Sequence, residues 1–195
     1  MNTNELSPEK SIQIISEMLE KSRKDFEKDS GTPMIIWGAV VTIVSIIIWY
    51  VLKATSNPYW NLLWFAIPLV GYPFNYFLYY KKQEKRAKNF LNNAIATIWG
   101  CFGIIATLLP IIACTLFHEA MMFLTSWITI ILGFASALTG LLMKNHWITM
   151  SGFVVAIAGG LVSVFMDYSN IPLLMGCAAL ITLLLPGIIL NLKKK

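Results

Sequence analysis

Long apolar runs separated by short polar stretches dominate this sequence from residue 34 to residue 192. A helix that crosses a bilayer needs about 20 consecutive, mainly apolar residues, and it satisfies its own backbone hydrogen bonds in the hydrocarbon. The pattern therefore predicts an all-α integral membrane protein with six transmembrane helices. The expected spans are residues 34–52, 60–80, 92–116, 120–143, 147–166 and 171–192.

The residues before the first span predict an amphipathic helix in water. Ser7–Glu9 supplies an N-cap, a proline in the first turn and an early acid, while Gly31 and Pro33 are expected to end the helix. We therefore divide the chain into a helical arm (1–33), a membrane domain (34–192) and a basic tail (193–195). The apolar stripe of the arm consists of Ile12, Ile15, Leu19 and Phe26, widened by Ile14 and Met18.

The positions of the basic residues predict the orientation of the chain. With the N-terminus inside, 14 of the 15 Lys and Arg residues lie on the cytoplasmic side, and Lys53 alone lies outside. Basic residues concentrate in cytoplasmic loops, so both termini are expected in the cytoplasm and the protein in the cytoplasmic (inner) membrane. Topology thus accounts for the net charge of +5, which gives no indication of nucleic acid binding.

Composition agrees with a protein whose main solvent is lipid. The chain is 57% hydrophobic and 13% charged, whereas soluble domains contain about 25% charged residues. Its three cysteines, Cys101, Cys114 and Cys177, all fall within expected spans. They do not predict a disulfide framework, and their role stays open.

Small and polar residues inside the spans mark candidate contacts. Gly152, Ala156 and Gly160 share one face of the fifth span, and a similar stripe on the third contains Gly100 and Gly103. Such residues let helices approach closely, although they also suit the wall of a narrow pathway. Asn75 is an amide within the second span, where it needs a partner, so it is a candidate for a functional role or for an inter-helix hydrogen bond.

Two spans share a sequence pattern that raises a transport alternative. Residues 99–116 align without gaps on residues 175–192, with eight of 18 positions identical, including Pro110 with Pro186. Because these two spans are expected to run in opposite directions, the pattern indicates a weak inverted repeat of three spans plus three, an architecture of secondary transporters. The alternative to an interaction protein is therefore a small oligomeric transporter or channel.

Catalytic and metal-binding patterns are missing from the sequence. No Asp, Glu, Lys or Arg lies in the middle of a span, and His118-Glu119 lacks the second histidine of a zinc-protease helix because position 122 is Met122. We find neither a phosphate-binding loop nor a nucleophile motif. We therefore expect no enzymatic activity, no cofactor, no metal site and no catalytic residues.

The arm is the candidate partner-contact surface. Its seven acids and five bases give a net charge of −2, whereas helices that bind anionic lipid are normally basic. Its stripe, with Ile15, Leu19 and Phe26 as candidate contact residues, is therefore expected to pack on protein. One hypothesis docks it on the chain's own cytoplasmic face near the basic segment 81–88, and the other on a cytoplasmic protein partner.

Short motifs in the arm and spans resemble those of a known family. They include Ile14–Met18, Ser22–Phe26, Ile36–Gly38 and Leu185–Gly187. The chain resembles a family of small multi-pass bacterial membrane proteins that has no established activity. The resemblance implies a signalling or stress-response context and no site residues. We expect a non-enzymatic protein that acts through interaction or regulation and is surrounded by the lipid bilayer, with a homo-oligomer as one candidate assembly.

Overall fold

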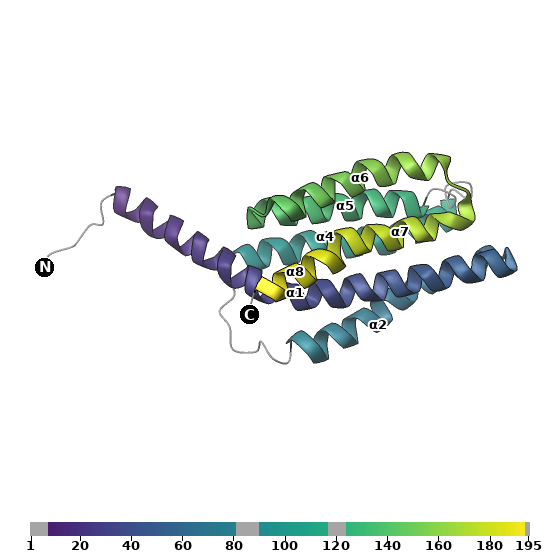
Figure 1. Cartoon of the computed structure of the whole chain (residues 1–195), viewed down its shortest axis with the longest axis horizontal. Helices are drawn as coiled ribbons and strands as arrows, with labels where there is room; N and C mark the ends of the chain where they lie inside the picture. The colour runs from purple at the N-terminus through teal and green to yellow at the C-terminus, as the bar shows by residue number, and fades with distance from the viewer. Residues whose placement is uncertain (1–7, 81–89, 117–123, 194–195) are drawn as a thin grey trace, which may run out of the picture.

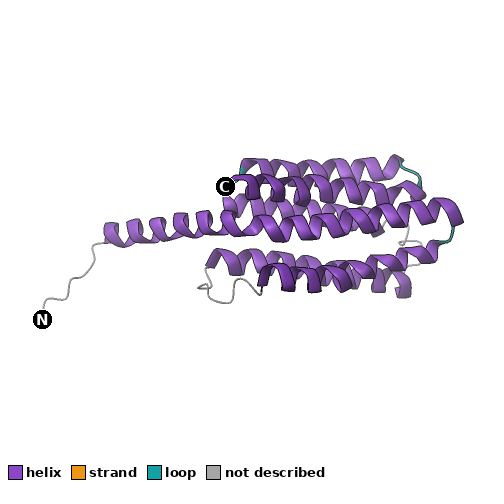
Figure 2. Cartoon of the chain, turned by 60° about the horizontal axis from the view of Figure 1, so that its bottom comes forward, coloured by secondary structure: helices purple, strands orange, loops and turns teal. Residues whose placement is uncertain are grey.

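The structure is a computed structural model that describes residues 8–80, 90–116 and 124–193. Within these ranges every element is a helix, which confirms the all-α fold (Figure 2). Five helices are long and apolar enough to cross a membrane. They are Ser30–Thr55, Leu91–Ile112, Leu124–Met143, His146–Phe165 and Tyr168–Leu192.

Helix α1 (Pro8–Thr55) joins the arm to the first span without a break (Figure 1). The expected helix end at Gly31 and Pro33 is therefore wrong. Pro33 removes one amide donor from the helix, which bends a helix without necessarily ending it. Gly31 serves close packing, since a Cβ atom there would lie 2.9 Å from the carbonyl oxygen of Gly187.

The remaining spans form a bundle beside α1 (Figure 1). Helices α5 (Leu124–Met143) and α6 (His146–Phe165) form an antiparallel hairpin, and α4 (Phe90–Leu116) packs on α5 and α1. The last crossing consists of α7 (Ile171–Ala179), the π-helical segment η5 (Leu180–Leu184) and α8 (Leu185–Lys193). The arm projects beyond the bundle at the end where the C-terminus also lies.

Small residues bring α1 into close contact with the last crossing. Gly31, Gly38 and Ser45 recur at every seventh position of α1 and are all buried. A Cβ atom on Gly38 would lie 2.7 Å from the backbone nitrogen of Leu184, and one on Gly176 would lie 3.1 Å from Cβ of Ser45. The two helices therefore meet at backbone distance, the geometry that small residues allow in membranes.

The expected second span has an irregular backbone. It consists of the 3-10 helix η1 (Pro58–Phe65), α2 (Ala66–Asn75) and the π-helical segment η2 (Tyr76–Tyr80). Pro68 and Pro73 both lie in α2 and lack amide donors, so the regular hydrogen-bond pattern is interrupted at the carbonyls of Trp64 and Leu69. No single piece is long enough to cross a bilayer, so a second span over 60–80 stays a prediction.

The two segments of the aligned sequence pattern have different structures. Helix α4 stays α-helical through Pro110, whereas the last crossing contains η5 directly before Pro186. Pro186 cannot donate to the carbonyl of Thr182, and the hydroxyl of Ser136 on α5 donates to it instead, at 3.4 Å. In their apolar windows, 6% of the α4 residues and 50% of the last-crossing residues are buried. The shared sequence pattern therefore does not give the two helices equivalent surroundings.

We predict opposite effects for the same substitution at two glycines. Gly38→Ala should destabilise the protein by about 1–3 kcal/mol, because the new methyl meets the backbone of Leu184. Gly100→Ala should be neutral or stabilising by up to about 1 kcal/mol, since no neighbouring helix in the described ranges comes within 4 Å of its Cβ position and alanine favours a helix. Unfolding in mild detergent measures both. Equal shifts for the two variants would contradict the close contact.

Candidate functional site

The apolar stripe of the arm is exposed to solvent. Ile12 is 68% exposed, Ile15 58%, Met18 65% and Leu19 40%. All four precede the membrane-spanning part of α1, which begins at Ser30. The stripe is therefore uncovered among the described residues, and docking of Ile15 and Leu19 near the basic segment stays a prediction. The Phe26 side chain and the basic segment 81–88 lie outside what the structure describes.

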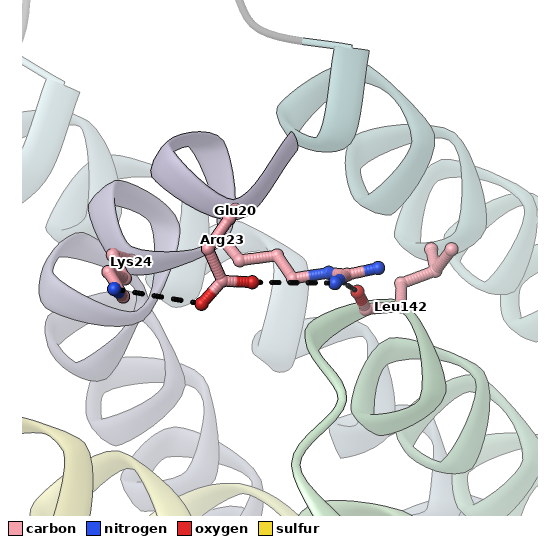
Figure 3. Close-up of polar contacts among 4 residues, drawn as sticks. All are labelled: Glu20, Arg23, Lys24 and Leu142. Carbon is pink, nitrogen blue, oxygen red and sulfur yellow. Dashed lines mark hydrogen bonds and ion pairs between the residues drawn. The ribbon is translucent and has the colours of Figure 1, made fainter. Parts of the chain in front are cut away.

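Arg23 joins the arm to the bundle (Figure 3). Its Nε donates a hydrogen bond to the carbonyl oxygen of Leu142 at 3.2 Å, 119 positions away in the sequence. Its Nη1 lies 3.7 Å from Oε2 of Glu20, whose other oxygen lies 3.7 Å from Nζ of Lys24. Arg23 thus fixes the arm to the bundle near its base, while Ile12, Ile15, Met18 and Leu19 beyond that point are exposed.

The turn after α5 explains why the Leu142 carbonyl is open to Arg23. The last carbonyls of a helix have no partner within the helix. The amide of Asn145 donates to Gly140 at 2.9 Å, and that of Lys144 donates to Leu141 at 3.1 Å. This is a Schellman motif with Lys144 in the left-handed region at a φ of 53°. The motif leaves Leu142 to another donor, and a cation suits the C-terminal end of a helix.

Asn145 completes this turn from its other side. Its Oδ1 accepts hydrogen bonds from the amides of Trp147 at 3.2 Å and Ile148 at 3.4 Å, which caps α6. Lys144 and Asn145 thus form the whole connection between α5 and α6, and hydrogen bonds of this pair cap both helix ends. Arg23 therefore binds a well-defined turn and fixes the arm relative to the α5–α6 hairpin.

The candidate small-residue stripe lies between α5 and α6. Gly152 and Ala156 are buried, and Cβ positions built at Gly152 and Gly133 contact the backbones of Ala137 and Ala156, respectively. Gly160 is half-buried, and a Cβ atom there would lie 3.0 Å from Cδ1 of Ile130. The stripe therefore faces a neighbouring helix. The stripe expected on the third span differs, because no atom of another described helix lies within 4 Å of the Cβ positions of Gly100 and Gly103.

Most of the buried hydroxyl groups in the bundle donate to their own helices, whereas Ser136 donates across to Thr182 and the Ser126 hydroxyl has no partner among the described residues. Five of them donate to the carbonyl four residues earlier, at 2.7–2.8 Å. A hydroxyl bonded in this way has little hydrogen-bonding capacity left for a passing solute. These groups therefore indicate a packed helix interface and not the wall of a pathway. The five are Thr42, Ser45, Thr129, Thr139 and Thr182.

Asn75 keeps an unmet hydrogen-bonding requirement. Its Oδ1 is buried, and within the described part of the chain it has no hydrogen-bond partner. The residue ends α2, directly before the π-helical segment η2. An unpaired polar atom in an apolar interior costs about 1–3 kcal/mol, so a partner for this oxygen would stabilise the protein.

The far end of the bundle holds a polar cluster that sequence reasoning missed. The indole nitrogen of Trp49 donates to Asn170 at 3.2 Å, and the amide of Asn61 donates to the Tyr168 hydroxyl at 2.6 Å. These bonds join α1 and η1 to the turn η4 (Tyr168–Asn170) before α7. An adjacent cavity of about 280 Å³ is lined by Leu52, Ser56 and the backbone turn at residues 167–169. Ligand sites usually exceed about 300 Å³, so the cluster functions best as a structural joint.

No feature of the described residues indicates a metal centre. They contain no group of three or more His, Cys, Asp or Glu side chains that could hold a metal ion. Cys101 and Cys177 are free thiols on exposed surfaces of apolar spans. Comparison with protein-family models, curated proteins and solved structures finds no match to this chain.

We predict that the contact between α5 and α6 tolerates no large side chain. Ala156 is 4% exposed and lies against Gly133, so Ala156→Leu should destabilise the bundle by about 1–3 kcal/mol. Val162 is 42% exposed on the same helix, which makes Val162→Leu a matched control with little expected effect. Thermal unfolding in detergent compares the two. Equal stability would show that Ala156 is not in a close contact.

Proposed function

We propose that this chain is a six-span membrane protein without catalytic activity that acts by binding another protein through its cytoplasmic arm. The exposed stripe of Ile12, Ile15, Met18 and Leu19 carries the proposal. The many exposed apolar side chains of the spans have lipid as a solvent, whereas this stripe stands in water on a helix with acidic and basic neighbours. Contiguous apolar surface in water typically marks an interaction site.

The geometry of α1 supports a role in binding at a distance from the membrane. Leu19 lies 11 residues before Ser30, where the spanning part begins. At a rise of about 1.5 Å per residue, the stripe starts about 16 Å beyond that point. A partner would therefore meet the arm in solution, and the helix would connect that contact directly to the membrane domain.

The length of the irregular segment supports six crossings. Residues Pro58–Tyr80 form η1, α2 and η2 in direct succession, with 8, 10 and 5 residues. At about 1.5 Å per residue they reach about 35 Å, enough for a hydrocarbon core of about 30 Å. With six crossings and 14 of 15 basic residues on one side, both termini lie in the cytoplasm.

A small oligomeric transporter or channel remains the second proposal. The unpaired Oδ1 of Asn75 supports it, because polar atoms at membrane depth often belong to a substrate path. The uncovered glycines of α4 would suit contacts between copies. Five interior hydroxyls weigh against it, since they bond to their own helices.

The first test concerns the stripe. Ile15→Asp should abolish binding of protein partners to the arm, because a charge at the centre of the stripe opposes its burial. Binding is measured by cross-linking to the arm in intact cells and by co-purification in mild detergent. Gln13→Asp adds the same charge to an exposed position outside the stripe and should leave these partners in place. Partners that persist in Ile15→Asp would contradict binding through the stripe.

The second test concerns topology. Cysteines introduced at Ser56 and Ser169 in a cysteine-free chain should react with a membrane-impermeant thiol reagent applied to intact cells. A cysteine introduced at Gln83 should react only after the cells are opened, because the basic segment around it favours the cytoplasm. Reaction of Gln83→Cys from outside would overturn the proposed orientation.

A further inference from the structure

Arg23 contacts the bundle near the base of the arm, and a bend lies between Arg23 and the rest of α1. Arg23 bonds to the turn after α5, and eight residues later Gly31 lies against Gly187 and Asn191 of α8. Pro33 follows within the same helix and removes an amide donor. Figure 1 shows the arm leaving the bundle at an angle to the rest of α1. Below Gly31 the helix is held by its close contact with the last crossing, so bending concentrates at residues 31–33.

We propose that the arm is a two-position element that moves about a hinge at Gly31–Pro33 and is held in one position by Arg23. In the held position, the Arg23 guanidinium bonds to the Leu142 carbonyl. In the released position, this bond is open and the arm swings away from the α5–α6 turn. The proposal concerns motion of the arm and holds whichever partner the arm binds.

The surroundings of Arg23 allow this bond to open and close. The Arg23 side chain is 23% exposed, so water reaches the guanidinium. Glu20 lies one turn earlier on the same helix and stays beside Arg23 when the arm moves. Opening therefore leaves the guanidinium beside Glu20 and in water, which favours a reversible contact.

The bond also connects the arm to a structured part of the bundle. Leu142 belongs to the capped turn in which Gly140, Leu141 and Asn145 have their own bonds. A ligand that binds the released arm better than the held arm shifts the equilibrium towards release, and release leaves the Leu142 carbonyl to water. By linkage, any change that stabilises the Arg23 bond weakens the binding of such a ligand. Arg23 is thus the positioning residue for the arm.

Distance measurements on the full chain in lipid nanodiscs test the proposal. Spin labels are placed at Gln13 on the arm and at His146 at the start of α6, in a chain whose native cysteines are replaced by alanine. Pulsed electron resonance then gives the distribution of distances between the labels. Arg23→Ala should add a second, longer maximum to this distribution. Lys24→Ala also removes one base beside Glu20 but has no bond to α5, so its distribution should match that of the parent.

Two further measurements make every outcome decisive. A second label pair at Lys53 and Leu161 monitors the bundle itself and should be unchanged in Arg23→Ala. If that pair changes, Arg23 is a folding contact and the proposal is wrong. Adding Pro33→Ala to Arg23→Ala restores an amide donor to the helix, so the distribution should return to a single maximum. A distribution that stays double would overturn the hinge, and identical distributions for Arg23→Ala and Lys24→Ala would overturn the role of Arg23.

Discussion

The close contact between α1 and the last crossing determines how the rest of the structure is arranged. Lipid provides little hydrophobic drive for helices to associate, so van der Waals contact must hold the bundle together. Gly31, Gly38 and Gly187 remove the side chains that would keep the two helices apart. With the first and last helices joined in this way, the α5–α6 hairpin packs on the last crossing, and the arm extends from the end of the bundle.

The sequence was sufficient for features that depend on hydropathy over whole helices. The all-α fold and five of the expected spans follow from apolar runs of about 20 residues, because the bilayer sets the length of a crossing. It was insufficient where a glycine or proline has more than one use. Gly31 and Pro33 read as a helix end, but in the structure Gly31 provides close packing within a continuous helix.

The candidate site shows the same division. Helical spacing placed Ile15 and Leu19 on one apolar face, while their exposure depends on the direction that the arm takes after residue 31. Arg23 could not be singled out from the sequence, because its acceptor is a backbone carbonyl 119 positions away. The small-residue pattern on α4 resembled that on α6, yet among the described residues the pattern on α6 faces a neighbouring helix and Gly100 and Gly103 of α4 do not. Such patterns give the capacity for close approach and do not specify the partner helix.

The unequal burial of α4 and α5 bears on how the chain enters the membrane during synthesis. The apolar window of α4 has a mean hydropathy of 2.2 with 6% of its residues buried, whereas that of α5 has 1.8 with 56% buried. Helix α4 can therefore partition into lipid by itself, on the strength of its own side chains. Helix α5 contains the buried polar residues Thr129, Ser136 and Thr139, which disfavour its transfer by itself from the insertion machinery into lipid. Its two-residue connection to α6 allows both helices to enter lipid together as a preassembled pair, held by the close contact at Gly133 and Gly152.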